Sequence, residues 1–132
     1  MKTVFLIDDD LDDREIFQEA LQSLNLTTRY VEAFDGLNAL EKISENDFVI
    51  PDIIFADLNM PRLGGLEFLK KVRANPECKN VPVYIYSTSS AKEECDKCMA
   101  AGAAGFITKH YSFEDLEKEL EKLIGNNPVF FP

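Results

Sequence analysis

The sequence is poor in basic residues, in cysteine and in long apolar runs. It has 14 Lys and Arg against 24 Asp and Glu, which gives a formal net charge of −10. Nucleic acids and anionic membrane surfaces select basic patches, so we expect neither as the main partner. Three cysteines do not suggest the disulfide framework of a small secreted protein. The apolar run at residues 4–7 is far too short for a signal-peptide core or a membrane span, and we expect a cytoplasmic protein.

The acidic residues are concentrated in one short segment. The chain has 132 residues, 45% of them hydrophobic, which fits one globular domain. Five of the 24 acidic residues fall within positions 8–13: Asp8, Asp9, Asp10, Asp12 and Asp13. Without these five, 19 acidic residues face 14 basic ones, a net charge of −5. Half of the negative excess therefore lies in six positions and needs a physical reason.

Apolar runs typical of strands alternate with helical patterns along the whole chain. Strands are predicted at residues 3–7, 29–34, 53–56, 81–86 and 105–108. Apolar residues at helical spacing follow each of them: Phe17, Ala20, Leu21 and Leu24; Leu37, Leu40 and Ile43; Leu66, Leu69 and Val72; Ala91, Cys95, Cys98 and Met99; Leu116, Leu120, Leu123 and Ile124. Ser90 is a candidate N-cap, and Gly102 and Gly125 are candidate helix ends. Five strands alternating with five helices predict a doubly wound α/β domain with a parallel sheet.

Chemically active side chains follow four of the predicted strands. Asp8 and Asp9 come after the first strand, Asp57 after the third, Ser87 after the fourth and Lys109 after the fifth. In a doubly wound sheet the ligand site lies at the carboxyl ends of the strands, so we expect these side chains to converge. Three clustered carboxylates repel one another unless a cation lies among them, and oxygen ligands favour Mg²⁺ or a similar divalent ion. A lysine and a hydroxyl beside that ion suit a phosphoryl group.

These segments resemble the receiver domain of two-component response regulators, including the single-domain chemotaxis type. The matching stretches are Val4–Asp9, Ile54–Pro61 with Gly65, Ser87, and Gly105–Lys109. The resemblance covers roughly residues 3–124. It implies a flavodoxin-like (βα)5 fold with strand order 2-1-3-4-5, a receiver domain over residues 1–125 and a short tail over residues 126–132. We expect a stand-alone receiver.

The resemblance also implies a role for each site residue. Asp57 is the phosphoacceptor, and Mg²⁺ or Mn²⁺ is bound by the side chains of Asp9 and Asp57, by the Asn59 main-chain carbonyl and by Asp8, mostly through water. Lys109 and Ser87 contact the phosphoryl group, and Phe106 follows the inward shift of Ser87. Thr88 stands where a small residue normally leaves access to the phosphoryl group. His110 stands where the family usually has a proline joined to the lysine by a cis peptide bond.

The implied partners are proteins. A sensor histidine kinase or a histidine phosphotransfer protein supplies the phosphoryl group, and a downstream protein target reads the change. The face made by the fourth helix, the fifth strand and the fifth helix is the candidate surface for that target or for a homodimer. The chain is then no enzyme beyond its own phosphotransfer and dephosphorylation.

Other interpretations of these residues are open to test. Asp10, Asp12 and Asp13 suit the N-terminus of a helix, where acidic side chains are favoured. A calcium loop starting at Asp8 is excluded because Asp13 occupies its glycine position. An aspartyl phosphatase needs a second acid two positions after the nucleophile, where this chain has Asn59. The pair Cys95 and Cys98 has redox or half-zinc spacing, although its place on an apolar stripe favours packing.

Overall fold

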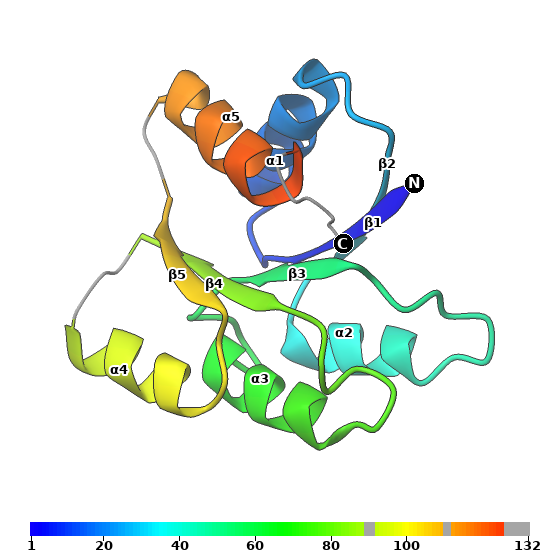
Figure 1. Ribbon diagram of the computed structural model, residues 1–132. Coiled ribbons are helices and arrows are strands. Elements are labelled where there is room, and N and C mark those ends of the chain that lie inside the picture. Colours follow the sequence, from blue (N-terminus) through cyan, green and yellow to red (C-terminus); the bar gives the residue numbers. More distant parts are fainter. Residues whose placement is uncertain (89–91, 110–111, 126–132) are drawn as a thin grey trace.

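Five strands form one parallel sheet in the order β2-β1-β3-β4-β5 (Figure 1). The computed structural model describes residues 1–88, 92–109 and 112–125. The strands are β1 (Lys2–Ile7), β2 (Thr28–Ala33), β3 (Ile53–Ala56), β4 (Val83–Ser87) and β5 (Gly105–Thr108). Each adjacent pair is parallel, with Val4 beside Tyr30 and Ile53, for example. The predicted fold class and strand order are confirmed.

Helices cover both faces of the sheet. They are α1 (Leu11–Ser23), α2 (Gly36–Ile43), α3 (Gly65–Ala74), α4 (Lys92–Ala100) and α5 (Phe113–Leu120), which continues as the π-helical turn η1 (Glu121–Gly125). Figure 1 shows α1 and α5 on one side of the sheet and α2, α3 and α4 on the other. No helix of the described segments is both long and apolar enough to cross a lipid bilayer.

The alternation of side chains in β1 builds two cores from one strand. Val4 and Leu6 join the core beneath α1 and α5, which includes Phe17. Phe5 and Ile7 join the opposite core, beneath α2, α3 and α4. Because successive strand residues point to opposite faces, a run of apolar residues is what a strand covered on both sides requires.

Two of the predicted apolar stripes include a residue that the structure leaves exposed. Leu37 is 40% exposed, and Met99 is 49% exposed. Helix α2 packs through Gly36, Ala39 and the predicted Ile43. A Cβ on Gly36 would lie 2.4 Å from the Leu63 carbonyl oxygen, so glycine lets the helix approach the β3–α3 loop. In α4, Cys98 is the buried residue, since the rest of that helix lies at the margin of the sheet.

Helix ends follow the predicted chemistry where they are described. Asp10 caps α1, and its side chain accepts hydrogen bonds from the backbone N–H groups of Asp12 and Asp13. Gly102 ends the segment after α4 with a φ of +102°, a left-handed conformation that favours glycine. Four of the sequence predictions lie outside the described residues. They concern the cap Ser90, the stripe residue Ala91, the Lys109–His110 peptide and the tail over residues 126–132.

Candidate functional site

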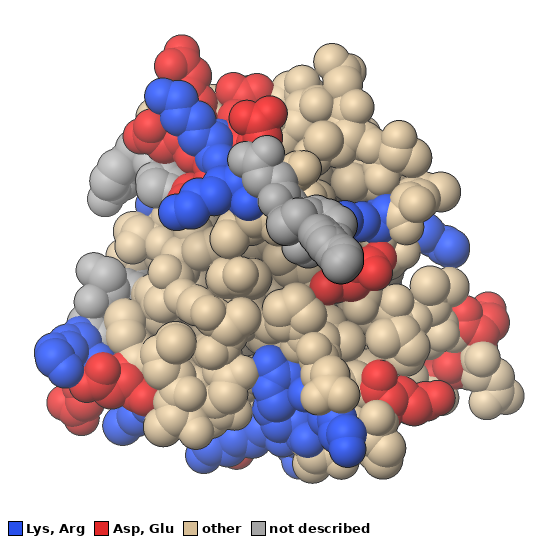
Figure 2. Space-filling model, viewed as in Figure 1, with Lys and Arg blue, Asp and Glu red and all other residues tan. Residues whose placement is uncertain are grey.

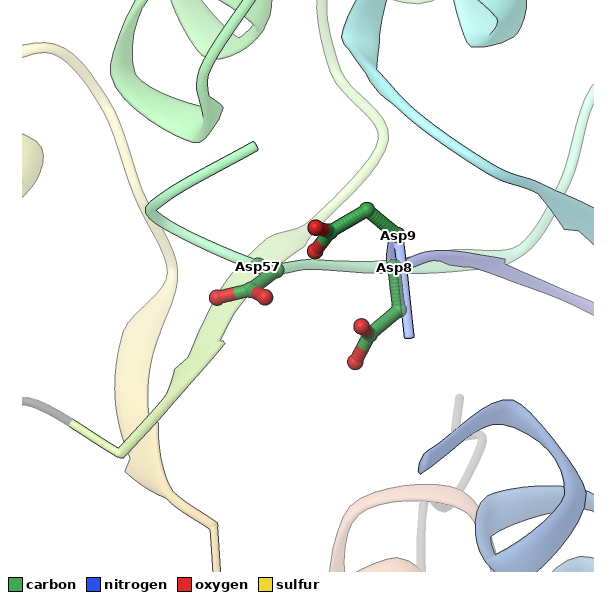
Figure 3. Close-up of side chains that lie close together, drawn as sticks. All are labelled: Asp8, Asp9 and Asp57. Atoms are coloured by element: carbon green, nitrogen blue, oxygen red, sulfur yellow. The ribbon is translucent and has the colours of Figure 1, made fainter. Parts of the chain in front are cut away.

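Three carboxylates meet at the carboxyl edge of the sheet. Asp8 and Asp9 follow β1, and Asp57 follows β3, whose end is joined to β1 by a 2.9 Å hydrogen bond from the Asp57 N–H to the Ile7 carbonyl. Each of the three side chains offers an oxygen within 4.8 Å of the others, and Figure 3 shows the carboxylates gathered between the two strand ends. The predicted convergence of these three acids is confirmed.

Glycine at the start of α3 permits this arrangement. Gly65 is the first residue of α3, and its N–H donates to the Leu58 carbonyl at 2.9 Å. A Cβ on Gly65 would lie 2.3 Å from the Asp57 carbonyl oxygen. A side chain there would push the helix away from the end of β3, so glycine allows α3 to begin directly beneath Asp57.

Burial changes the acidity of two of the carboxylates. Desolvation raises the pKa of Asp8 to about 6, although Lys109 and the Asp10 N–H lower it. Desolvation also raises the pKa of Asp57, against the lowering effect of Lys109. Asp9 is exposed to solvent. Two of the acids are therefore costly to keep ionised unless more positive charge arrives.

Asp8 has an oxygen that is suited to a metal ion. Its Oδ1 accepts the Asp10 N–H at 3.0 Å. Its buried Oδ2 accepts no hydrogen bond of good geometry within the described segments and meets Lys109 Nζ as an ion pair at 2.8 Å. A buried oxygen with spare lone pairs, beside two further carboxylates, fits the all-oxygen ligand set of Mg²⁺ or Mn²⁺.

Lys109 brings the positive charge of the site. Its N–H donates to the Ser87 carbonyl at 2.8 Å, which ties the residue after β5 to the end of β4. Nζ lies 2.8 Å from Asp8 Oδ2, 2.8 Å from Asp13 Oδ2 and 3.3 Å from Asp57 Oδ2. The side chain is 10% exposed. Burial lowers the pKa of Lys109, but the hydrogen bond to Asp13 and the ion pair with Asp8 outweigh this effect and hold the pKa above its ordinary value. The group is therefore a cation at neutral pH.

The remaining predicted residues lie around this centre. Ser87 is buried at the last position of β4, beside Thr108 of β5. Thr88 is exposed, as is Asn59, whose N–H approaches Asp57 Oδ1 at 3.4 Å. Phe106 lies within β5 and packs against the core beneath α2, α3 and α4.

The sequence interpretation missed the part that Asp13 takes in this site. Asp13 lies in the first turn of α1, as predicted for a helix-start acid, but its side chain also bonds to Lys109, 96 positions later. The acidic run was the available signal. It does not show which of five neighbouring acids faces a lysine on a distant strand.

A second missed feature holds the loop between Asp57 and α3. Asp35 caps α2 and is paired through both carboxylate oxygens with Arg62, at 2.7 and 3.1 Å. The Gly36 N–H also donates to the Leu63 carbonyl at 3.2 Å. Arg62 lowers the pKa of Asp35, and Arg62 itself has a φ of +66°. This pairing fastens the β3–α3 loop, which carries Asn59, to the start of α2.

Known proteins resemble this chain in sequence and in fold. A family model described as the response regulator receiver domain matches residues 4–121. Chemotaxis protein CheY-3 of Vibrio cholerae is 32% identical over 120 residues, which cover 91% of this chain and 89% of that protein. The Mn²⁺-bound form of response regulator Rcp1 has a TM-score of 0.85 at 25% identity and covers 100% of this chain and 99% of its own. The phosphorylated cyanobacterial phytochrome response regulator RcpA has a TM-score of 0.83 at 28% identity, covering 92% and 90% of the two chains.

Proposed function

Because the chain belongs to the response regulator receiver domain family, we propose that Asp57 accepts a phosphoryl group from a histidine kinase or a histidine phosphotransfer protein. The proposal depends on the surroundings of Asp57. Carboxylate oxygens of Asp8 and Asp9 lie within 4.8 Å of an Asp57 oxygen, and Lys109 Nζ lies 3.3 Å from Asp57 Oδ2. An Asp57 oxygen attacks phosphorus and forms the new O–P bond. The N–P bond of phosphohistidine, or the acyl O–P bond of a small donor, breaks as imidazole or a carboxylate leaves with the bonding pair.

Asp8, Asp9 and Asp57, with the Asn59 carbonyl, are the proposed ligands of a divalent cation, Mg²⁺ or Mn²⁺. When bound, the cation would neutralise the negative charge of the phosphoryl oxygens. The donor set supports this assignment, since it consists of oxygen atoms and includes the Oδ2 atom of Asp8 described above. Three carboxylates then face a charge of +2 from the ion and +1 from Lys109, which balances the site before phosphorylation.

Lys109 and Ser87 are the proposed contacts of the phosphoryl oxygens. Their backbones are already joined at the ends of β4 and β5, so movement of Ser87 toward a phosphoryl group pulls on β5, which carries Phe106. The surface made by α4, β5 and α5 is the proposed output face for a downstream protein or a second copy of the chain. Thr88 is the exposed residue beside Ser87 and is proposed to limit the access of water to the phosphoryl group.

The test uses beryllium trifluoride, a stable mimic of the phosphoryl group, and acetyl phosphate as a small donor. With Mg²⁺ present, we expect beryllium trifluoride to shift NMR signals around Asp57 and acetyl phosphate to add the mass of one phosphoryl group. Asp57→Ala should abolish both responses, whereas Asp47→Ala, which removes an exposed carboxylate elsewhere, should retain them. A response that needs no Mg²⁺, or one that persists in Asp57→Ala, contradicts the proposal. Sustained release of inorganic phosphate would indicate a phosphatase instead.

A further inference from the structure

The Lys109 ammonium group is shared among three acids. It has three N–H donors, and one oxygen each of Asp8, Asp13 and Asp57 lies within 3.3 Å of Nζ. With its side chain 10% exposed, Lys109 has little contact with water. A new oxygen acceptor can therefore bind this ammonium strongly only if it displaces one of the three carboxylates.

Asp13 differs from the other two partners in its position and in its exposure. It comes from the first turn of α1, and it is outside the group of carboxylates that lie within 4.8 Å of one another. Its side chain is 33% exposed, while that of Asp8 is fully buried. A divalent cation bound by Asp8, Asp9 and Asp57 would compensate the charge of Asp8 and Asp57, but it would leave Asp13 on Lys109.

Capping of α1 does not account for the Asp13 carboxylate. Asp10 already accepts the N–H groups of Asp12 and Asp13 at 2.8 and 3.2 Å. Within the described residues, the Asp13 side chain makes one hydrogen bond and one ion pair, and Lys109 is the partner in both. The placement of this carboxylate is thus a feature of the site and not of the helix end.

We propose that Asp13 is a positioning residue that holds Lys109 in the unphosphorylated state and competes with the phosphoryl group for its ammonium. The inference rests on the proposed function, because it assumes that Lys109 contacts the phosphoryl oxygens. Asp13 orients the lysine over the site in the absence of a ligand. It must then give up at least part of that bond when a phosphoryl group arrives, and it therefore weakens phosphoryl binding.

Asp13→Asn tests the competition, with Asp12→Asn as the matched control. Asparagine keeps a neutral acceptor at position 13, so the lysine is held more weakly and the helix start is preserved. Asp12 carries the same charge one residue away on an exposed side chain, so its replacement measures the general effect of charge. We expect the apparent dissociation constant for beryllium trifluoride, with Mg²⁺ saturating, to fall roughly threefold to fivefold in Asp13→Asn, the upper part of what a partly exposed ion pair provides. In Asp12→Asn it should change less than twofold.

Two further measurements separate positioning from a structural effect. Asp13→Glu retains the carboxylate and should keep the wild-type affinity. The ¹H–¹⁵N signal of Lys109 Nζ should move on addition of beryllium trifluoride in the wild type, and in the free protein it should already be displaced by Asp13→Asn but not by Asp12→Asn. Equal effects of Asp13→Asn and Asp12→Asn, or weaker binding in Asp13→Asn, overturn the inference while leaving the proposed function intact. A wild-type protein that binds no beryllium trifluoride with Mg²⁺ overturns the proposed function first.

Discussion

At the scale of single residues, burial decides how much the ionised carboxylates of the site lower the stability of the fold. Asp8 is fully buried and its pKa is raised to about 6, from 3.8 for an ordinary aspartate. The folded protein therefore binds the Asp8 proton more tightly than the unfolded chain does. The favourable contribution of the protonated form is complete below about pH 4 and is lost as the pH rises through 6. At neutral pH and without a dication, ionised Asp8 opposes folding.

Asp8→Asn should therefore stabilise the protein at pH 7 in the presence of a chelator. The amide has nearly the shape of the carboxyl group and no charge to desolvate, and we expect a gain of about 2 kcal/mol in the free energy of unfolding. The gain should shrink toward pH 4, where the wild-type carboxyl is protonated in the folded state and about half protonated in the unfolded chain. Urea unfolding followed by circular dichroism at several pH values measures it. Asp12→Asn, at an exposed position, should show little change, and a destabilised Asp8→Asn at pH 7 would contradict the argument.

At the scale of elements, the loop after β3 is fixed by a contact between distant segments. Arg62 pairs with Asp35 at 2.7 Å and its guanidinium lies 5.7 Å from the centre of the Phe34 ring. Asp35 is buried at the start of α2 and Arg62 is half exposed, so the pair is screened on one side. Through this contact the end of β2 and the start of α2 define the path of the loop that carries Asn59.

Arg62→Gln should lower the free energy of unfolding at pH 7, because it leaves a buried carboxylate without its charged partner. Arg62 lowers the pKa of Asp35 below its ordinary value of 3.8. The pair therefore stabilises the fold above about pH 4 and loses its effect as the pH falls through the lowered pKa. Denaturant titrations from pH 7 to pH 2 should show the gap closing. Lys70→Gln, which breaks an exposed pair with Glu67, should cost less than half as much; equal losses would refute this role for Arg62.

Helices and strands were predictable from the sequence where the burial of an element shows in its own residues. Strands β3 and β5 have the predicted bounds of residues 53–56 and 105–108, and the other three differ by at most two residues at either end. A buried parallel strand is apolar along its whole length, which makes it visible in the sequence. The apolar stripes were less reliable at Leu37 and Met99, because spacing along a helix does not show how much of it a neighbour covers. The pairings of Asp13 with Lys109 and of Asp35 with Arg62 join segments 96 and 27 residues apart and follow only from the fold.

At the scale of the whole molecule, the placement of charge matters more than its sum. Figure 2 shows one face whose centre is mostly uncharged, with Lys, Arg, Asp and Glu gathered toward its margins. The net charge of −10 has half of its excess in residues 8–13. Two of those acids, Asp8 and Asp9, belong to the carboxylate cluster at the end of β1. Repulsion between these two acids and Asp57 lowers the stability of the entire domain, since unfolding moves Asp57 away from them.

A divalent cation should consequently stabilise the whole domain, and not only order its site. A ligand that binds the folded state alone adds about 2.7 kcal/mol to the free energy of unfolding at a hundredfold excess over its dissociation constant, which raises the unfolding midpoint by several degrees for a domain of this size. We expect this rise with Mg²⁺ or Mn²⁺ and a much smaller one with NaCl at equal ionic strength, because screening alone does not bridge the three carboxylates. Asp9→Asn should remove most of the rise, whereas Asp12→Asn, which deletes an equal charge outside the cluster, should retain it. If both variants respond alike in a thermal melt, the ion acts through general screening and the carboxylates at the ends of β1 and β3 do not form a specific site.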